Sequence, residues 1–220
     1  MIEREPYDDT MMILERLGAI VANSHIVYTS GRHGRAYVNK DALYPYTQET
    51  SLIAARIAAA FADDQIEIVA GPTIGGVILA QWVAHHLGYV LGRPVLAVFA
   101  EEQIGIDGSR LRVFRRGYAD YLTSRRVLVV EDVLTTGQSA RAVVDAVDAA
   151  GGQVAGLGAL CNRGGVTAEI LHVPRLAALV DLPLESWDEA ECPLCAAGVP
   201  VNTAVGKGAE FVARTQHPDA

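Results

Sequence analysis

Residues 127–140 read VLVVEDVLTTGQSA, and this stretch is the most informative part of the sequence about the class of fold. The aliphatic run 127–130 is too short for a comfortable helix and is typical of a strand covered on both faces, as in a parallel sheet. The run stops at Glu131 and Asp132. These acids are therefore expected at the carboxyl end of a strand, where open α/β sheets bind ligands. Carboxylates at that place can accept hydrogen bonds from the hydroxyls of a sugar or bind a metal ion.

A loop rich in hydroxyl groups follows the two acids and leads into a helical pattern. Backbone N–H groups of such a loop can converge on an anion, and the amino terminus of the next helix favours negative charge. The stretch therefore predicts a ribose 5-phosphate site, with acids for the sugar and a loop for its phosphate. An ordinary capped turn would explain the hydroxyls but not the paired acids. The predicted phosphate-binding residues are Thr135, Thr136, Gly137, Gln138 and Ser139.

This order of strand, acid pair and TTG loop resembles the 5-phosphoribosyl 1-pyrophosphate (PRPP) binding motif of type I phosphoribosyltransferases. The resemblance covers roughly residues 12–201. It implies an α/β fold with a mainly parallel central sheet, flanked by helices and completed by a small hood. We expect a single phosphoribosyltransferase domain over 1–220, with a core of about 50–185 and a hood from about 10–45 and 185–205.

Composition narrows the class of protein. The chain has 220 residues, half of them hydrophobic, which is enough for one sizeable core. Its formal net charge of -8 argues against a nucleic-acid surface. No apolar run is long enough to span a bilayer, and the acidic amino terminus is unlike a secretory signal. Three cysteines, an odd number, fit a reducing compartment, so we expect a cytoplasmic protein.

The amino-terminal part predicts a helix from Thr10 to about residue 21, bent or weakened at Gly18, after a charged end at 1–9. Residues 25–45 predict two short strands around a glycine turn that carries cations. A solvated hairpin tip is the simpler interpretation of that turn. Orotate phosphoribosyltransferases have a similar SGR segment in the base pocket. The resemblance implies that Ser30, Gly31 and Tyr37 contact the base and that Arg32 contacts pyrophosphate. This chain has Thr29 at a position where the family often has a lysine.

A second glycine-rich turn follows a predicted buried strand at 66–70. It reads GPTIGG at 71–76 and precedes a helix expected to run to about His86. Glycines at a strand end let backbone N–H groups approach a ligand closely, although a plain tight turn would look the same. The resemblance implies a pyrophosphate loop here, formed by Thr73, Ile74, Gly75 and Gly76.

Residues 101–117, EEQIGIDGSRLRVFRRG, form a polar excursion after a predicted strand at 95–100. A mobile lid and a β-hairpin turning at Asp107 and Gly108 are both compatible with the pattern. Relatives carry lysines in this segment, whereas this chain has Glu102, which would repel pyrophosphate. The remaining candidate cations are Arg110, Arg112, Arg115 and Arg116.

The rest of the chain continues the α/β pattern. Helices are expected at 48–61 and 138–150, and strands at 154–160 and 176–182, the last near a sheet edge. Arg163 matches a family arginine that reads the carboxylate of orotate, an apt residue because arginine can form two parallel hydrogen bonds. A surface arginine in a turn is the alternative interpretation.

The carboxyl-terminal part contains CPLC at 192–195. One such pair supplies two of the four ligands of a closed zinc site, and the sequence shows no clear second pair. We therefore expect a proline-bearing turn with buried thiols, with zinc shared between subunits as the alternative. No side chain of the chain is assigned to a metal.

The resemblance implies transfer of the 5-phosphoribosyl group from PRPP to orotate, a pentosyltransferase reaction of pyrimidine nucleotide biosynthesis. It also implies a magnesium cofactor and a homodimer, with Glu131 and Asp132 as the catalytic residues. Two alternatives remain: a phosphoribosyltransferase for a purine or another base, and a regulatory homologue that binds PRPP without turnover. Glu102 favours the regulatory homologue.

Overall fold

The computed structural model describes residues 6–28, 30–106, 108–182 and 185–216. Contacts divide the chain into two compact units. The core unit is Met1–Met11 with Tyr44–Leu182, and the end unit is Met12–Leu43 with Pro183–Ala220. Within the described ranges, none of the helices combines the length and apolar character needed to cross a bilayer.

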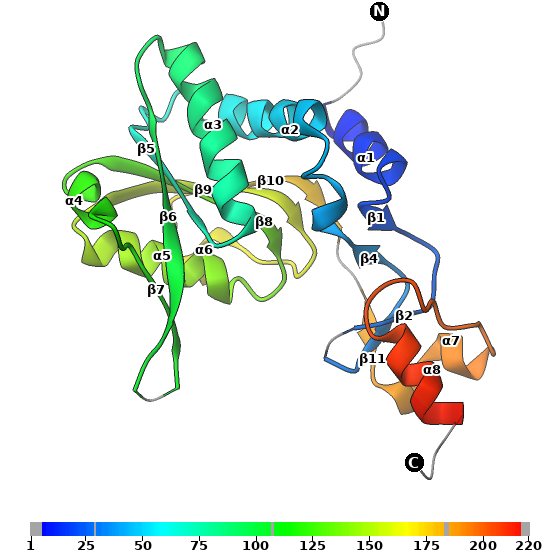
Figure 1. Cartoon of the computed structure of the whole chain (residues 1–220). Coiled ribbons are helices and arrows are strands. Elements are labelled where there is room, and N and C mark those ends of the chain that lie inside the picture. Colours follow the sequence, from blue (N-terminus) through cyan, green and yellow to red (C-terminus); the bar gives the residue numbers. More distant parts are fainter. Residues whose placement is uncertain (1–5, 29, 107, 183–184, 217–220) are drawn as a thin grey trace, which may run out of the picture. The chain divides into compact units, whose positions relative to one another are not determined.

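The core unit is built on a six-stranded, mainly parallel sheet (Figure 1). Every neighbouring pair is parallel except the last, β6 with β7. Parallel strands need coverage on both faces, which explains why their sequences are aliphatic runs rather than alternating ones. In sheet order the strands are β10 (Leu176–Asp181), β9 (Gln153–Asn162), β8 (Arg126–Leu134), β5 (Ile68–Pro72), β6 (Leu96–Ile104) and β7 (Arg110–Val113).

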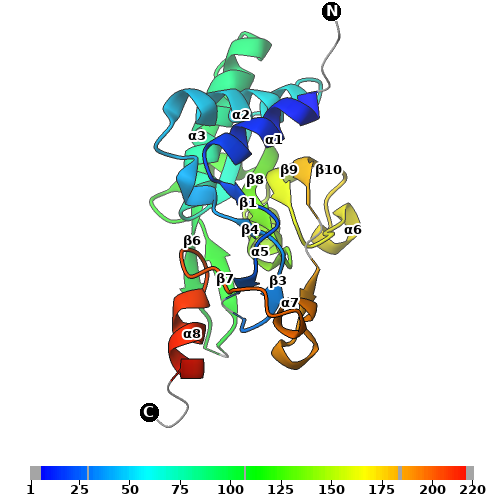
Figure 2. The same cartoon turned by 90° about the vertical axis from the view of Figure 1, so that its right-hand side faces the viewer.

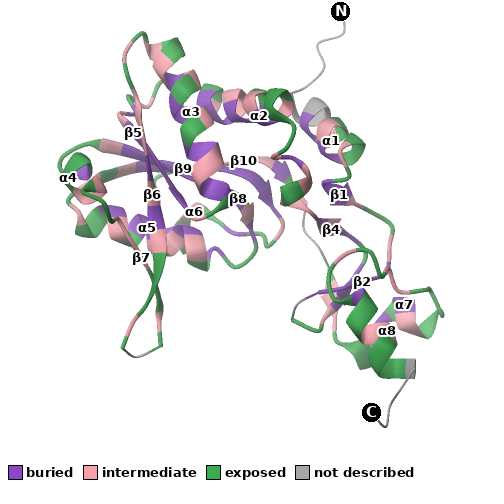
Figure 3. Ribbon diagram, in the orientation of Figure 1, coloured by how far each residue is buried: buried purple, intermediate pink, exposed green. Residues whose placement is uncertain are grey.

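Helices cover both faces of this sheet (Figures 1 and 2). Leu128 and Val130 pack in one apolar cluster with α2 (Thr47–Ala60) and α3 (Gly75–Leu91). Their neighbours Val127 and Val129 point the other way, because side chains alternate along a strand. They pack with α5 (Gln138–Ala149) and α6 (Ala168–Leu171). Strand β5 is accordingly buried along its whole length, and β8 and β9 along most of theirs (Figure 3). Two further helices are α1 (Pro6–Arg16) and α4 (Tyr118–Leu122).

The strand order reverses direction between β5 and β8. From β5 the chain continues to β6 on one side, whereas from β8 it continues to β9 on the other. The two strands are parallel neighbours, with Ala70 opposite Val129, so their carboxyl ends lie at the same edge of the sheet. Because α3 and α5 leave this edge toward opposite faces, a crevice is expected between the loops that precede them.

The end unit is made of short elements from both ends of the chain. Its sheets have the orders β11–β3–β2 and β1–β4. The carboxyl-terminal segment is tied to β2 by hydrogen bonds from the N–H of Asn202 to the carbonyl of His25, at 2.8 Å, and from Lys207 to Val27, at 2.7 Å. The elements are β1 (Ile20–Val21), β2 (Ile26–Val27), β3 (His33–Gly34), β4 (Tyr37–Val38), η1 (Lys40–Ala42), β11 (Ser186–Trp187), η2 (Glu189–Glu191), α7 (Pro193–Ala196) and α8 (Gly208–Gln216).

Several boundaries differ from the sequence predictions. Helix α1 begins at Pro6 and ends at Arg16, so Gly18 does not bend it but terminates it. Gly18 has a φ of +66°, and the N–H of Ala19 bonds to the carbonyl of Leu14 at 2.8 Å, as in a glycine-based helix stop. Helix α3 continues to Leu91, because its own stop is Gly92 at a φ of +63°.

The segment 101–117 forms the predicted hairpin. Strand β6 extends to Ile104 instead of ending at 100 and pairs antiparallel with β7, Glu102 lying opposite Arg112. At the turn, Gly108 has a φ of +80° and donates a hydrogen bond to the carbonyl of Gly105 at 3.0 Å. Asp107, the other predicted turn residue, lies outside the described residues.

Candidate functional site

The acid pair lies in the carboxyl-terminal half of β8, and the strand continues past both residues to Leu134. Glu131 and Asp132 are 6% and 3% exposed, in a chain whose other acids are mostly at the surface. Each carboxylate accepts a backbone N–H: that of Asp132 reaches Oε1 of Glu131 at 3.1 Å, and that of Val133 reaches Oδ1 of Asp132 at 2.7 Å. Carboxylates are seldom buried unless they are paired or hydrogen-bonded, as these two are.

Two residues from other parts of the core unit shape the surroundings of Asp132. The hydroxyl of Tyr44 donates to Oδ2 of Asp132 at 3.1 Å. Gly75, at the start of α3, lies under the same oxygen, since a Cβ built on it would stand 1.7 Å from Oδ2 and 2.7 Å from the Tyr44 hydroxyl. Only glycine therefore allows the carboxylate this position. Sequence reasoning missed Tyr44, for which the only signal was an aromatic residue just before Pro45.

The loop after β8 has the form expected of a phosphate-binding loop. Gly137 precedes α5 with a φ of +78°, a backbone conformation that favours glycine. Thr135 and Thr136 are exposed before it, and Gln138 and Ser139 form the first turn of the helix. The predicted loop and the acid pair therefore come from one continuous strand, turn and helix.

Arg163 also reaches this loop. Its Nε donates to the hydroxyl of Thr135 at 2.9 Å. The turn after β9 approaches so closely that a Cβ on Gly164 would stand 1.6 Å from the carbonyl oxygen of Thr135. The structure thus places Arg163 beside the predicted phosphate loop. Its role in reading the base remains a prediction.

The loop after β5 contains Thr73, Ile74, Gly75 and Gly76. Its backbone is tightly folded, because a Cβ on Gly71 would stand 2.2 Å from the carbonyl oxygen of Gly76. The N–H of Thr73 is bonded to the carbonyl of Ala100 at 3.1 Å, so this donor is already used. The side chain of Ile74 is 79% exposed. The predicted pyrophosphate loop therefore lies at the same sheet edge as the acid pair.

Arg112 on β7 connects the two loops. Its guanidinium donates to the hydroxyl of Thr73 at 3.1 Å and to that of Ser139 at 3.0 Å. The side chain is 11% exposed, so water screens its positive charge less than it would at the surface. Sequence reasoning named four arginines in this hairpin without separating them, since only pairing with β6 shows which one faces the loops.

Glu102 is the partner of this arginine rather than an isolated negative charge. Its carboxylate lies 3.7 Å from the guanidinium of Arg112 and 3.8 Å from that of Arg110. These contacts do not add positive charge to the site, so the expected effect of Glu102 on pyrophosphate stays a prediction. A cavity of about 800 Å³ adjoins this pair. Its lining includes Glu102, Arg112, Thr136, Gln138 and Ser139.

Three of the predicted base-site residues, Ser30, Gly31 and Tyr37, lie in the end unit, whereas Arg163 lies in the core unit. Gly31 has a φ of +80°, and the hydroxyl of Ser30 accepts the N–H of Arg32 at 3.4 Å. The guanidinium of Arg32 bonds to the hydroxyl of Ser186 at 3.0 Å and to Asp188 at 2.8 Å, both within the same unit. Tyr37 lies on β4 and is half-buried. Thr29, which replaces a family lysine, lies outside the described residues.

The structure corrects the interpretation of the CPLC segment. The sequence showed no second pair of ligands, but His25 and His33 lie beside Cys192 and Cys195 in the end unit. No local sequence pattern indicates this arrangement, because the histidines are separated from the cysteines by most of the chain.

Comparison with known proteins identifies the family of the chain. Residues 46–176 match the family model of the phosphoribosyl transferase domain. Orotate phosphoribosyltransferase of Pelotomaculum thermopropionicum is 36% identical over 193 residues, which cover 88% of this chain and 94% of that protein. Orotate phosphoribosyltransferase of Thermus thermophilus is 34% identical over 193 residues, and the match covers 88% of this chain and 98% of that protein.

Solved structures show the same fold. Orotate phosphoribosyltransferase of Mycobacterium tuberculosis in complex with PRPP superposes with a TM-score of 0.61 at 27% identity, covering 81% of this chain and 97% of that one. Adenine phosphoribosyltransferase of Thermoanaerobacter pseudethanolicus, at 18% identity, shares the fold with a TM-score of 0.58 over 77% of this chain and 99% of its own. The match to the family model and the similarity to these relatives show that the chain belongs to the phosphoribosyltransferase family, and the acid pair beside the Thr135–Ser139 loop is consistent with this.

Proposed function

We propose that the protein transfers the 5-phosphoribosyl group of PRPP to orotate, giving orotidine 5-phosphate and pyrophosphate. The observation that carries this proposal is the buried acid pair on β8, followed directly by the Thr135–Ser139 loop at the start of α5. The identity of more than 30% with orotate phosphoribosyltransferases over 88% of the chain favours orotate as the acceptor.

In this proposal the acid pair holds the ribose. Glu131 and Asp132 accept hydrogen bonds from its hydroxyls, and their negative charge stabilises the positive charge that develops on the sugar as the bond to pyrophosphate breaks. Residues 135–139 anchor the 5-phosphate through backbone N–H groups and hydroxyls. Tyr44 keeps Asp132 oriented through its hydrogen bond at 3.1 Å.

Pyrophosphate departs with the bonding electron pair, so its site must supply positive charge. Arg112 is the best-placed cation, because it already contacts Thr73 of one loop and Ser139 of the other. We assign pyrophosphate to Arg112 and residues 73–76, with Arg32 as an additional contact. A ring nitrogen of the base then forms the new bond to the sugar and releases its proton to solvent. Ser30, Gly31, Tyr37 and Arg163 are proposed to position that base.

Magnesium is the proposed cofactor, as it is in general for phosphoribosyltransferases. The carboxylate oxygens of Glu131 and Asp132 are hard donors of the kind that Mg²⁺ prefers, so the residues present fit the ion. When bound, the ion would neutralise charge on pyrophosphate and ribose oxygens. The role of the chain's own residues is to orient PRPP and to exclude water around it.

A panel of bases tests the acceptor. The full chain is incubated with PRPP and Mg²⁺, and pyrophosphate release is followed with orotate, uracil, adenine or hypoxanthine. We expect release with orotate and little with the others. Release with only another base would assign a different acceptor. Measurable PRPP binding without release in any reaction would indicate the regulatory homologue instead.

We also propose that the two units form one phosphoribosyltransferase domain and that the protein acts as a homodimer in the cytoplasm. The match to relatives over 88% of the chain supports a single domain, since it includes segments of both units. Light scattering during size-exclusion chromatography measures the mass in solution. A mass of one chain, unchanged by PRPP, would contradict the dimer.

A further inference from the structure

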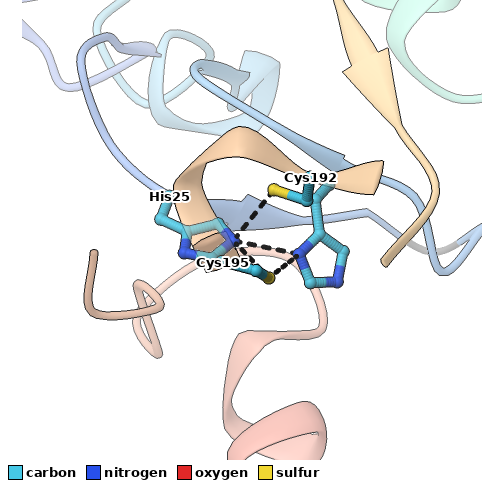
Figure 4. Close-up of side chains that lie close together, drawn as sticks. His25, Cys192 and Cys195 are labelled. Carbon is cyan, nitrogen blue, oxygen red and sulfur yellow. Dashed lines mark hydrogen bonds between the residues drawn. The ribbon is translucent and has the colours of Figure 1, made fainter. Parts of the chain in front are cut away.

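Two histidines and two cysteines meet inside the end unit. His25 precedes β2 and His33 lies on β3, whereas Cys192 and Cys195 come from the segment around α7. His25, His33 and Cys192 are buried, and Cys195 is half-buried. Figure 4 shows the side chains of His25, Cys192 and Cys195 turned toward one another. Residues far apart in the chain thus present imidazole and thiol groups to one point.

The nitrogen–sulfur distances between these groups are close to those of a tetrahedral zinc site. The four donor atoms all lie within 4.8 Å of one another. Nε2 of His25 is 3.7 Å from each cysteine sulfur, and Nδ1 of His33 is 3.3 Å from Sγ of Cys195. A zinc ion bound at its usual distances to nitrogen and sulfur would hold such atoms about 3.6 Å apart. The two histidine nitrogens, at 2.9 Å, would need to separate only slightly.

The surroundings orient the histidines as ligands. Nδ1 of His25 lies 2.7 Å from the carbonyl oxygen of Val199, so this nitrogen carries the proton and donates it. Nε2 of His25 is then left with a lone pair that faces the cluster. The ring of His33 packs edge-on against Phe211 of α8, with centroids 4.8 Å apart. Its other nitrogen, Nε2, is buried and has no hydrogen-bond partner among the described residues, so the ring's polar contacts are directed to the cluster.

The end unit has a structural need for such a link. Its described strands are only two residues long, and its two segments are joined at positions such as Cys192 and His25, which are 167 residues apart in the sequence. Small units with little apolar core are commonly stabilised by disulfides or metals. Four protein ligands leave no open position for substrate, which is typical of a structural site rather than a catalytic one.

We propose that His25, His33, Cys192 and Cys195 bind one structural zinc ion that links the two segments of the end unit. Zinc is the expected metal because thiolates and imidazoles in a tetrahedral arrangement suit it, whereas magnesium prefers oxygen ligands. On binding, both thiols lose their protons to solvent. The two positive charges of the ion then balance the negative charges of the two thiolates. This site is separate from the magnesium proposed for PRPP, and it does not depend on the proposed function.

Metal content of the purified full chain tests the proposal. The protein is produced without a polyhistidine tag, treated briefly with a weak chelator, and measured by inductively coupled plasma mass spectrometry. We expect about one zinc per chain. Cys192→Ser and His33→Gln should lose most of it. Cys161→Ala and His85→Gln are the matched controls, since they remove a cysteine and a histidine outside the cluster, and both should keep the wild-type content.

A cobalt experiment with the wild-type chain avoids variants that fail to fold. Zinc is removed, Co²⁺ is added, and the absorption spectrum is recorded. Tetrahedral binding by two thiolates should produce strong thiolate-to-cobalt charge transfer, and added zinc should abolish it. The proposal is overturned by substoichiometric metal in both native and reconstituted wild-type protein, by a six-coordinate cobalt spectrum, or by a Cys192–Cys195 disulfide in freshly purified protein. These readouts do not require enzymatic activity, so they are independent of the acceptor assay.

Discussion

The hydroxyl of Tyr44 donates a hydrogen bond to Oδ2 of Asp132 at 3.1 Å, and Gly75 leaves the space that this oxygen needs. The contact joins residues 88 positions apart in the sequence. The other oxygen of this carboxylate, Oδ1, accepts a hydrogen bond from the N–H of Val133 at 2.7 Å. Both carboxylate oxygens of Asp132 are therefore oriented before any substrate binds. Preorganised charge of this kind is more effective than charge that must be aligned during the reaction.

Tyr44→Phe should reduce turnover by about tenfold, since a hydrogen bond to a charged group contributes about 1.5 kcal/mol or more. The ring and its packing remain, so the protein should still fold, with a melting temperature lower by about 3–6 °C. Steady-state kinetics with PRPP and orotate measure the effect. Tyr121→Phe, on an exposed residue of α4, is the control and should behave as wild type. Equal losses in both variants would argue against a role for the Tyr44 contact.

Asp132→Asn removes the charge while keeping the shape of the side chain. We expect turnover to fall by about 100-fold, because the developing charge on the ribose loses its buried counter-charge. Asp145→Asn is a suitable control, since Asp145 forms an exposed ion pair with Arg141 on α5. Wild-type turnover in Asp132→Asn would remove the basis for the ribose assignment.

Arg112→Gln should raise the KM for PRPP by at least about tenfold, because charge-assisted hydrogen bonds to a phosphate are worth about 1.5–3 kcal/mol. Arg112→Lys should recover part of the loss, as it restores the charge without the planar fork. Arg125→Gln, which removes an arginine with a half-exposed side chain before β8, controls for net charge. An unchanged KM in Arg112→Gln would exclude this arginine from the pyrophosphate site.

The buried thiol of Cys161 should make the free energy of unfolding depend on pH. Burial raises the pKa of its thiol from 9.0 to about 11. Between these values the unfolded chain has lost the proton and the folded chain keeps it, so stability falls as pH rises through that range. The lost contribution is about 2 to 3 kcal/mol. Urea unfolding from pH 8 to about 11 should therefore be less steeply pH-dependent in Cys161→Ala than in wild type. Parallel pH curves for the two proteins would contradict the shifted pKa.

What the sequence could predict was local. The strand, acid pair, loop and helix of residues 127–140 are contiguous, so hydrophobic pattern and turn chemistry were sufficient to identify them. The hairpin at 101–117 was predictable for the same reason, from its glycine turn. Boundaries were less accurate where a glycine ends a helix, as at Gly18, because the pattern alone does not show whether a glycine bends or stops it.

Tertiary structure decided which distant residues meet. The order of strands places the end of β5 beside the end of β8, and thereby brings Gly75 and Tyr44 to Asp132. The pairing of β7 with β6 selects Arg112 from four arginines, and the folding of the end unit brings His25 and His33 to the cysteines. Such contacts depend on the path of the chain through space, which periodicity and spacing do not encode, whereas a continuous motif carries its own geometry.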